Sequence, residues 1–142
     1  MRSRPLLLNL CMANKVQDHW TWRYEMAQAI ARQIDMERFG VKAIYLIGSV
    51  KTGNPGPCSD IDLLAHCDDH TEKHQLLRSW CEGWGLCLAY INNCKTGYDS
   101  KGSLIDLHII TDNDIKRKTS FAVMPDSYNN SAKLLRKSSS NE

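Results

Sequence analysis

Two aspartates separated by one residue, Asp60 and Asp62, stand at the start of an apolar stretch of the chain. In an extended strand the side chains at positions i and i+2 share a face, so both carboxylates point one way while Ile61 and Leu63 point into a core. Two neighbouring carboxylates repel each other unless a positive group lies between them. A divalent cation bound by oxygen ligands is the simplest such group. The alternative, two aspartates on the solvent face of an ordinary strand, is disfavoured because Asp is depleted in strands.

A glycine-serine pair lies upstream of these aspartates. The apolar run 44–47 stops at Gly48-Ser49, and ten residues rich in Gly and Pro separate this pair from Asp60. A turn from a strand into a short helix presents unpaired backbone N–H groups and a partial positive charge, which favour phosphate. Gly48 has no Cβ to block a close approach, and the Ser49 hydroxyl can donate to a phosphate oxygen. Gly-Ser alone would suit an ordinary strand-to-helix turn equally well, so its meaning depends on the aspartates.

The spacing between this glycine-serine pair and the two aspartates resembles the signature of the DNA polymerase beta-type nucleotidyltransferase superfamily, and it is closest to the minimal nucleotidyltransferases. Gly53 and Ser59 stand where those small enzymes usually carry glycine and serine. The family needs a third carboxylate on a neighbouring strand, and Asp106, within the apolar stretch 104–110, is the candidate. The resemblance covers about residues 41–111.

The resemblance implies a role for each of these residues. Asp60 and Asp62 would bridge two Mg²⁺ (or Mn²⁺) ions, and Asp106 would hold the ion that activates the acceptor hydroxyl. The expected catalytic and metal-binding residues are Asp60, Asp62 and Asp106, and the expected nucleotide-binding residues are Gly48, Ser49, Lys51 and Ser59. The implied reaction is an EC 2.7.7-type transfer of a nucleoside monophosphate, with AMP from ATP as the expected donor, to an acceptor hydroxyl. His108 shares the face of Asp106, where it either contacts substrate or merely lines the cleft.

Two other functions stay open. Many family members carry arginine just before the second glycine, whereas this chain has Thr52 beside Lys51, which favours a catalytically weak nucleotide-binding module of the same fold. The other alternative is an antitoxin-like module that binds a protein partner, because minimal nucleotidyltransferases often work beside a helical partner. Trp20 and Trp22 could serve such a contact, although packing in the core is the better interpretation of aromatic residues on an amphipathic helix. The acceptor (a protein side chain, a small molecule or an RNA end) and a homo-oligomer are likewise left undecided.

Composition excludes several classes of protein. A net charge of +2 is too small to indicate a nucleic-acid binder. The six cysteines show no CxxC pairing, so they are interpreted as reduced thiols of a cytoplasmic protein. Cys67, His70 and His74 have a spacing that suits zinc, but a structural site usually needs a fourth ligand. Residues 1–13 resemble a signal peptide only faintly, because Asn9 interrupts the apolar run. No stretch approaches the roughly 20 apolar residues of a membrane span, so no membrane contact is expected.

The first half of the chain predicts an alternation of helices and strands. A helix from about 15 to 39 is expected to begin with a capping box formed by Asn14 and Gln17 and to end at Gly40. A strand at 41–47, a short helix at 50–52 and a second strand beginning at the aspartate pair follow. A longer helix is expected at 70–82, preceded by a capping box of Asp69 and Glu72.

The second half is more ambiguous. Residues 86–91 fit either a strand or a second helix; the strand is preferred, paired antiparallel through a hairpin with a strand at 104–110. Thr111 is expected to cap a short helix. The 142 residues predict a single nucleotidyltransferase domain, with a core at about 14–118 and a flexible tail at 125–142. The predicted fold is α/β (α+β): a short mixed sheet that carries the metal site on one face, with helices packed on the other.

Overall fold

The structure, a computed structural model, describes residues 18–126 and 131–139. It forms an α/β domain built on a four-stranded mixed sheet with the strand order β3-β2-β1-β4. The strands are β1 (Val41–Ile47), β2 (Ile61–Cys67), β3 (Ile105–Ile110) and β4 (Lys133–Lys137). β1 is antiparallel to both β2 and β4, whereas β2 and β3 are parallel. The predicted fold class is therefore confirmed, as are three of the four predicted strands: those at 41–47, beginning at the aspartate pair and at 104–110.

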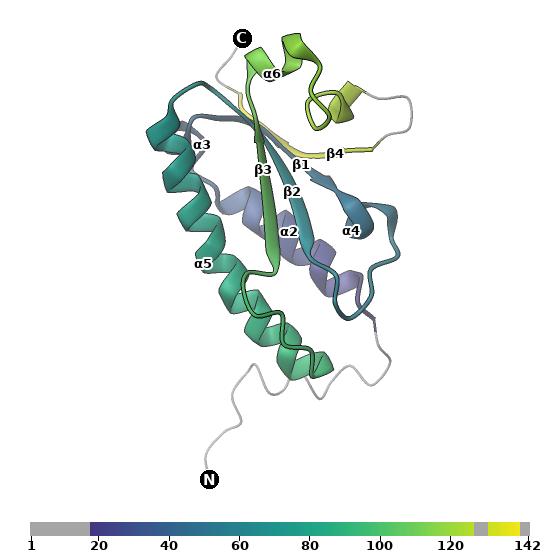
Figure 1. Cartoon of the computed structure of the whole chain (residues 1–142). Helices are drawn as coiled ribbons and strands as arrows, with labels where there is room; N and C mark the ends of the chain where they lie inside the picture. Colours follow the sequence, from purple (N-terminus) through teal and green to yellow (C-terminus); the bar gives the residue numbers. More distant parts are fainter. Residues whose placement is uncertain (1–17, 127–130, 140–142) are drawn as a thin grey trace.

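The two long helices pack on the same face of the sheet. Figure 1 shows α5 (Thr71–Thr96) running alongside β3 and α2 (Thr21–Gln33) behind the strands. The main core joins alternate strand residues, such as Ile44, Leu63 and Ile105, to Ile30 of α2 and Leu88 of α5. The intervening strand residues point to the opposite face, which carries a smaller apolar cluster and the polar site described below. This division follows from the two-residue period of a strand.

The predicted first helix is broken near its end. α2 stops at Gln33, Ile34 is extended, and a separate short helix, α3 (Met36–Phe39), begins after Asp35, whose side chain accepts a hydrogen bond from the Arg38 N–H at 3.1 Å. Gly40 ends α3 with φ of 66°, as expected for a glycine after a helix. The predicted capping box of residues 14 and 17 and the predicted start of this helix lie outside the described residues.

The preferred strand at 86–91 is wrong. α5 continues as one helix through Gly83 and Gly85 to Thr96, and β3 is parallel to β2 because this long helix carries the chain back along the sheet. A Cβ on Gly85 would lie 1.7 Å from the Ser103 Oγ, so the glycine permits close packing of α5 on the start of β3. The Leu104 N–H donates to the carbonyl of Gly85 at 2.9 Å. The predicted capping box is also absent at this helix: His70 is the N-cap and makes no side-chain cap bond.

The C-terminal segment is not wholly a loose tail. Residues 133–137 form β4 on the outer edge of β1. The Arg136 guanidinium donates to the carbonyls of Ala31, Arg32 and Ile34 at 2.8–3.0 Å, at the C-terminal end of α2. This charged group satisfies helix carbonyls that have no partner within the helix, and it ties the strand to the helix layer.

The remaining helices are short. α4 (Gly48–Thr52) follows β1 directly, and α6 (Asp112–Arg117) follows β3 with Thr111 as its N-cap, as predicted, in a capping box with Asp114. A 3₁₀ turn, η1 (Met124–Asp126), comes later. Across residues 18–126 and 131–139, no helix combines the length and the apolar character that crossing a membrane requires.

Candidate functional site

Three segments that are distant in sequence meet at one end of the sheet. Because β1 and β2 are antiparallel, the last residue of β1, Ile47, pairs with Asp62 near the start of β2. Because β2 and β3 are parallel, Asp62 in turn lies opposite Asp106. The glycine-serine pair that follows β1 and two of the predicted carboxylates are therefore neighbours, which sequence spacing alone could not establish.

Asp62, Asp106 and His108 form the compact part of this site. One donor atom from each lies within 4.8 Å of the donor atoms of the other two. The His108 Nε2 lies 3.3 Å from the Asp106 Oδ2, and the His108 ring stacks on Phe121 with a centroid distance of 4.1 Å and an interplanar angle of 19°. Asp60 precedes β2 and lies outside this trio, although it is near enough for the charge of Asp106 to act on it.

The electrostatics of the carboxylates favour a cation. Burial first, and then the negative charges of Asp106 and Asp60, raise the pKa of Asp62 to about 6, against a smaller opposite effect of His108. Burial, followed by the charge of Asp106, also raises the pKa of Asp60. Each carboxylate is thus harder to ionise because of the others. Two carboxylates and an imidazole at this separation fit a divalent metal ion, which would relieve the repulsion.

Gly48 brings the turn between β1 and α4 into contact with one of the carboxylates. It adopts φ of 75°, a conformation that residues with a Cβ rarely take, and a Cβ built on it would lie 2.1 Å from the Asp62 Oδ2. The backbone of α4 therefore begins in direct contact with the Asp62 side chain. Gly53, the second glycine of the motif, also has a positive φ, of 85°, where it ends α4. Ser49 is partly buried in the first turn of α4, and Lys51 lies in the last.

Polar side chains in and before the loop between α4 and β2 form hydrogen bonds within this segment. The Ser59 hydroxyl accepts a hydrogen bond from the Gly56 N–H at 2.8 Å, which closes a turn immediately before Asp60. Thr52, at the position where many family members have arginine, donates its hydroxyl to the Asn54 Oδ1 at 2.6 Å and to the Ser49 carbonyl at 3.1 Å. Thr52 is thus engaged within its own turn.

Two buried polar residues, Arg23 and Asn92, hold this loop and were missed in the sequence. Arg23 is fully buried, and its guanidinium donates to the carbonyls of Ser59 at 3.0 Å and Pro57 at 3.3 Å and to the Asn92 Oδ1 at 3.0 Å. Asn92 donates in turn to the Pro57 carbonyl at 2.9 Å. Burial lowers the pKa of Arg23 to about 10, partly offset by the nearby charge of Asp60. These contacts fix the backbone that leads into Asp60.

A signal for this pair did exist in the sequence. Arg23 stands four residues before Ala27, and Asn92 four residues after Leu88, so each interrupts the apolar stripe of its helix with a polar side chain. A polar residue on a buried stripe needs hydrogen-bonded partners inside the protein. Trp22 packs on the main core, as the core interpretation expected. Trp20, the N-cap of α2, is instead 38% exposed, and its indole N–H donates to the Val50 carbonyl at 2.9 Å.

The zinc-like spacing does not form a cluster. His70 and His74 both turn to Asp68: the His70 Nδ1 lies 3.1 Å from its Oδ1, and the His74 Nε2 lies 2.6 Å from its carbonyl oxygen. Cys67 is fully buried, and burial raises the pKa of its thiol to about 12, which disfavours the thiolate that zinc needs. Among the described residues, the group with metal-binding geometry is Asp62, Asp106 and His108.

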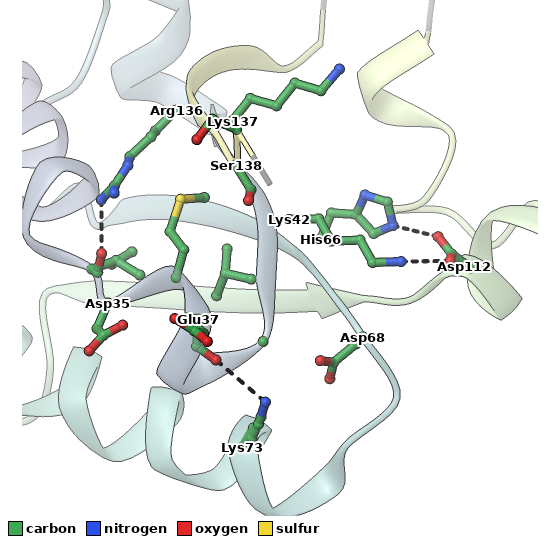
Figure 2. Close-up of a pocket in the computed structure, with 15 residues that line it drawn as sticks. Asp35, Glu37, Lys42, His66, Asp68, Lys73, Asp112, Arg136, Lys137 and Ser138 are labelled. Carbon is green, nitrogen blue, oxygen red and sulfur yellow. Dashed lines mark hydrogen bonds and ion pairs between the residues drawn. The ribbon is translucent and has the colours of Figure 1, made fainter. Parts of the chain in front are cut away.

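A pocket of about 880 Å³ lies at the opposite end of the sheet, where Val41 pairs with Cys67. Figure 2 shows its charged side chains, among which Asp112 accepts from Lys42 at 2.7 Å and contacts the His66 Nε2 at 2.8 Å. Both basic and acidic groups line it, and Lys42 and His66 both pair with Asp112. This pocket does not include the carboxylate site, so its size is no guide to the chemistry of the molecule.

The class of protein follows from this arrangement: a mixed-sheet α/β domain with acidic side chains on adjacent strands beside a glycine turn. Residues 30–92 match the model of the nucleotidyltransferase domain family, a span that includes the glycine-serine pair, Asp60 and Asp62. The match confirms the resemblance predicted from the motif: residues 30–92 of this chain are similar to that domain family.

Comparisons with curated sequences and with solved structures add little to the family match. No curated protein sequence matches this chain. Among solved structures, a protein from Sulfolobus solfataricus described as a candidate nucleotidyltransferase aligns with 13% sequence identity and a TM-score of 0.43, over 87% of this chain and 91% of that one.

Proposed function

We propose that this chain transfers a nucleoside monophosphate, AMP from ATP, to an acceptor hydroxyl in a reaction that depends on divalent metal ions. The observation that carries the proposal is the pairing of Asp62 with Asp106 across β2 and β3, in contact with the backbone turn at Gly48. Because residues 30–92 resemble a nucleotidyltransferase domain, that pairing supports a metal-binding role for the two acidic side chains beside a turn suited to phosphate.

The residues take the following parts in the proposal. Asp60, Asp62 and Asp106 would hold two Mg²⁺ or Mn²⁺ ions. When bound, such ions stabilise the charge on the attacking and leaving oxygens and lower the pKa of the attacking hydroxyl. The nucleotide-binding residues are Gly48, Ser49, Lys51 and Ser59.

The bonds exchanged are those of a substitution at phosphorus. The acceptor oxygen forms a bond to the α-phosphorus, the bond from that phosphorus to the β-phosphate oxygen breaks, and pyrophosphate leaves. The proton of the acceptor hydroxyl passes to the Asp106 carboxylate, which is solvent-exposed and can release it to water. Backbone N–H groups after Gly48 bind the β- and γ-phosphates, which positions the α-phosphorus near the carboxylates.

The test uses ATP labelled at the α-phosphate. The protein is incubated with Mg²⁺ or Mn²⁺ and three classes of acceptor in turn: proteins, small molecules with free hydroxyls, and RNA ends. We expect label transfer and pyrophosphate release from the wild type, and a loss of about 100-fold or more in Asp62→Asn and Asp106→Asn, equivalent to about 3 kcal/mol of transition-state stabilisation. Asp69→Asn, an exposed aspartate beyond the other end of β2, is the matched control and should retain full activity. Equal transfer by all four proteins would refute the proposal.

One observation favours a second candidate, a nucleotide-binding module with weak catalysis. Thr52 is neutral and bonded within its own turn, so it provides no cation for the triphosphate. In that case ATP would bind to the wild type in calorimetry with Mg²⁺ or Mn²⁺ present, yet no acceptor would become labelled. Thr52→Arg should then strengthen ATP binding, because a guanidinium can pair with phosphate oxygens.

A further inference from the structure

His108 lies beside the two carboxylates, Asp62 and Asp106, that neighbour each other across β2 and β3. It follows Asp106 by two residues in β3, and its Nε2 is 3.3 Å from the Asp106 Oδ2. Ligand atoms around one octahedral ion lie about 3 Å apart at right angles and about 4 Å apart across the ion, given bond lengths near 2.1 Å. The three donor atoms of Asp62, Asp106 and His108 are within 4.8 Å of one another. Small side-chain rotations would bring all three to one ion.

The imidazole is held in this orientation by its surroundings. Its ring stacks on Phe121 at 4.1 Å, and its side chain is 25% exposed. In this stacked position the ring has its Nε2 3.3 Å from the Asp106 Oδ2. A ligand whose ring is fixed by packing loses less conformational freedom when it binds a metal.

A second histidine-aspartate pair differs from the His108–Asp106 pair in the charge of its third neighbour. At the other end of the sheet, His66 lies 2.8 Å from Asp112, and the ammonium group of Lys42 also pairs with that carboxylate. There a cation already accompanies the pair. Beside His108 the additional neighbour is a further carboxylate, Asp62, so the same kind of pair stands in an environment of excess negative charge. That contrast favours a bound cation over a simple ion pair.

We propose that His108 is a direct ligand, through Nε2, in a two-carboxylate, one-imidazole site that selects a first-row transition-metal ion, Mn²⁺, over Mg²⁺. The proposal rests on the proposed function, in which the same carboxylates bind metal. Mg²⁺ takes oxygen ligands, whereas imidazole nitrogen is a good ligand for transition metals. The two carboxylates and the phosphate oxygens of a nucleotide keep Mn²⁺ suitable among these, because Mn²⁺ accepts oxygen ligands readily.

The test measures metal binding without reference to activity. Free Mn²⁺ is followed by electron paramagnetic resonance during titration of the wild type, and Mg²⁺ affinity is obtained by competition. In His108→Gln the dissociation constant for Mn²⁺ is expected to rise at least about tenfold, since even residues that only support a ligand contribute that much. The Mg²⁺ constant should change less than about threefold. His66→Gln, the matched control, should leave both unchanged.

A spectroscopic measurement separates a ligand from a residue with a structural role. Spin-echo modulation by imidazole nitrogen should appear on Mn²⁺ bound to the wild type and to His66→Gln, and should be absent in His108→Gln. If His108→Gln weakens Mn²⁺ and Mg²⁺ equally, or if the wild type shows no nitrogen modulation, His108 is not a ligand and the inference is overturned.

Asp62→Asn distinguishes this failure from that of the proposed function. If Asp62→Asn removes Mn²⁺ binding while His108→Gln does not alter the preference between the metals, the carboxylate site stands and only the role of His108 is refuted. If Asp62→Asn leaves Mn²⁺ binding unchanged, or if the wild type binds no Mn²⁺ at millimolar concentration, both proposals fail together.

Discussion

Replacing Asp62 by Asn is expected to stabilise the metal-free protein at neutral pH. Burial, together with the charges of Asp106 and Asp60, raises the pKa of Asp62 from 3.8 to about 6. A folded-state pKa above the unfolded value means that the folded chain binds this proton more tightly than the unfolded chain does. By linkage, the contribution of Asp62 to stability is greatest below about pH 4 and is lost as the pH rises to about 6 and above. The wild type therefore carries a penalty at neutral pH that the amide lacks.

The size of this penalty can be bounded from the two pKa values. The difference between 3.8 and about 6 corresponds to about 3 kcal/mol, because one pKa unit is worth about 1.4 kcal/mol. Asp62 is only partly buried, so solvent screens part of the repulsion and we expect about 1–2 kcal/mol. For a chain of 142 residues this is a rise in the melting temperature of about 3–8 °C.

The assay is thermal unfolding followed by circular dichroism in EDTA, near pH 4 and at pH 7.5. Asp62→Asn should melt higher than the wild type at pH 7.5 and at the same temperature near pH 4, and adding Mn²⁺ should raise the melting temperature of the wild type alone. Comparing the variant with the wild type at each pH cancels the contributions of groups such as Asp68 and Asp112, whose pKa values are lowered. Asp69→Asn serves as the control. A variant that melts below the wild type at pH 7.5, or by the same difference at both pH values, would refute the reasoning.

Two further substitutions test how the site is built. Gly48→Ala and Gly53→Ala both place a Cβ at a positive φ, which costs about 1–2 kcal/mol, but only the Cβ at position 48 collides with the Asp62 carboxylate, at 2.1 Å. Metal titration should therefore show lost binding in Gly48→Ala and near-normal binding in Gly53→Ala. Equal losses of metal binding in the two variants would contradict the contact between Gly48 and Asp62. Arg23→Met removes the donor to the Ser59 carbonyl and to the buried Asn92 Oδ1, so chemical denaturation should show a loss of about 2–4 kcal/mol, with weaker metal binding because the backbone before Asp60 loosens. Unchanged stability in Arg23→Met would show that the buried guanidinium does not hold this loop.

The strands and the motif could be predicted because their signals are local. Each signal depends on neighbours within a few residues: the apolar run 41–47, the turn at Gly48 and the alternation around Asp62. In the structure the strands at these places keep the buried and less buried faces that the alternation predicted. The face shared by Asp106 and His108 followed from the same two-residue period. None of these patterns required knowledge of which strands were neighbours.

The ambiguity at residues 86–91 could be resolved only by packing. Leu86, Leu88 and Tyr90 alternate with polar or small residues as they would in a strand. Of these three residues of α5, only Leu88 is buried, while Leu86 and Tyr90 are 51% and 61% exposed. The deciding contact is Gly85 against Ser103, far along the chain, and a glycine usually read as a helix breaker there permits close approach. The edge strand β4 was missed for a similar reason, because Arg136 finds its partners about a hundred residues away.

By itself, the sequence determined the chemistry that is available: a phosphate-type turn, two aspartates one residue apart and a third in a later apolar stretch, at a spacing shared with nucleotidyltransferases. Tertiary structure alone decided which of these meet. Asp62 lies with Asp106 and His108, Asp60 stands outside that trio, and Arg23 holds the loop between the motifs. The physical reason is that the spacing of residues along one strand fixes the face to which each side chain points. The distance between side chains on different strands depends instead on the register of the strands and on buried contacts between distant parts of the chain.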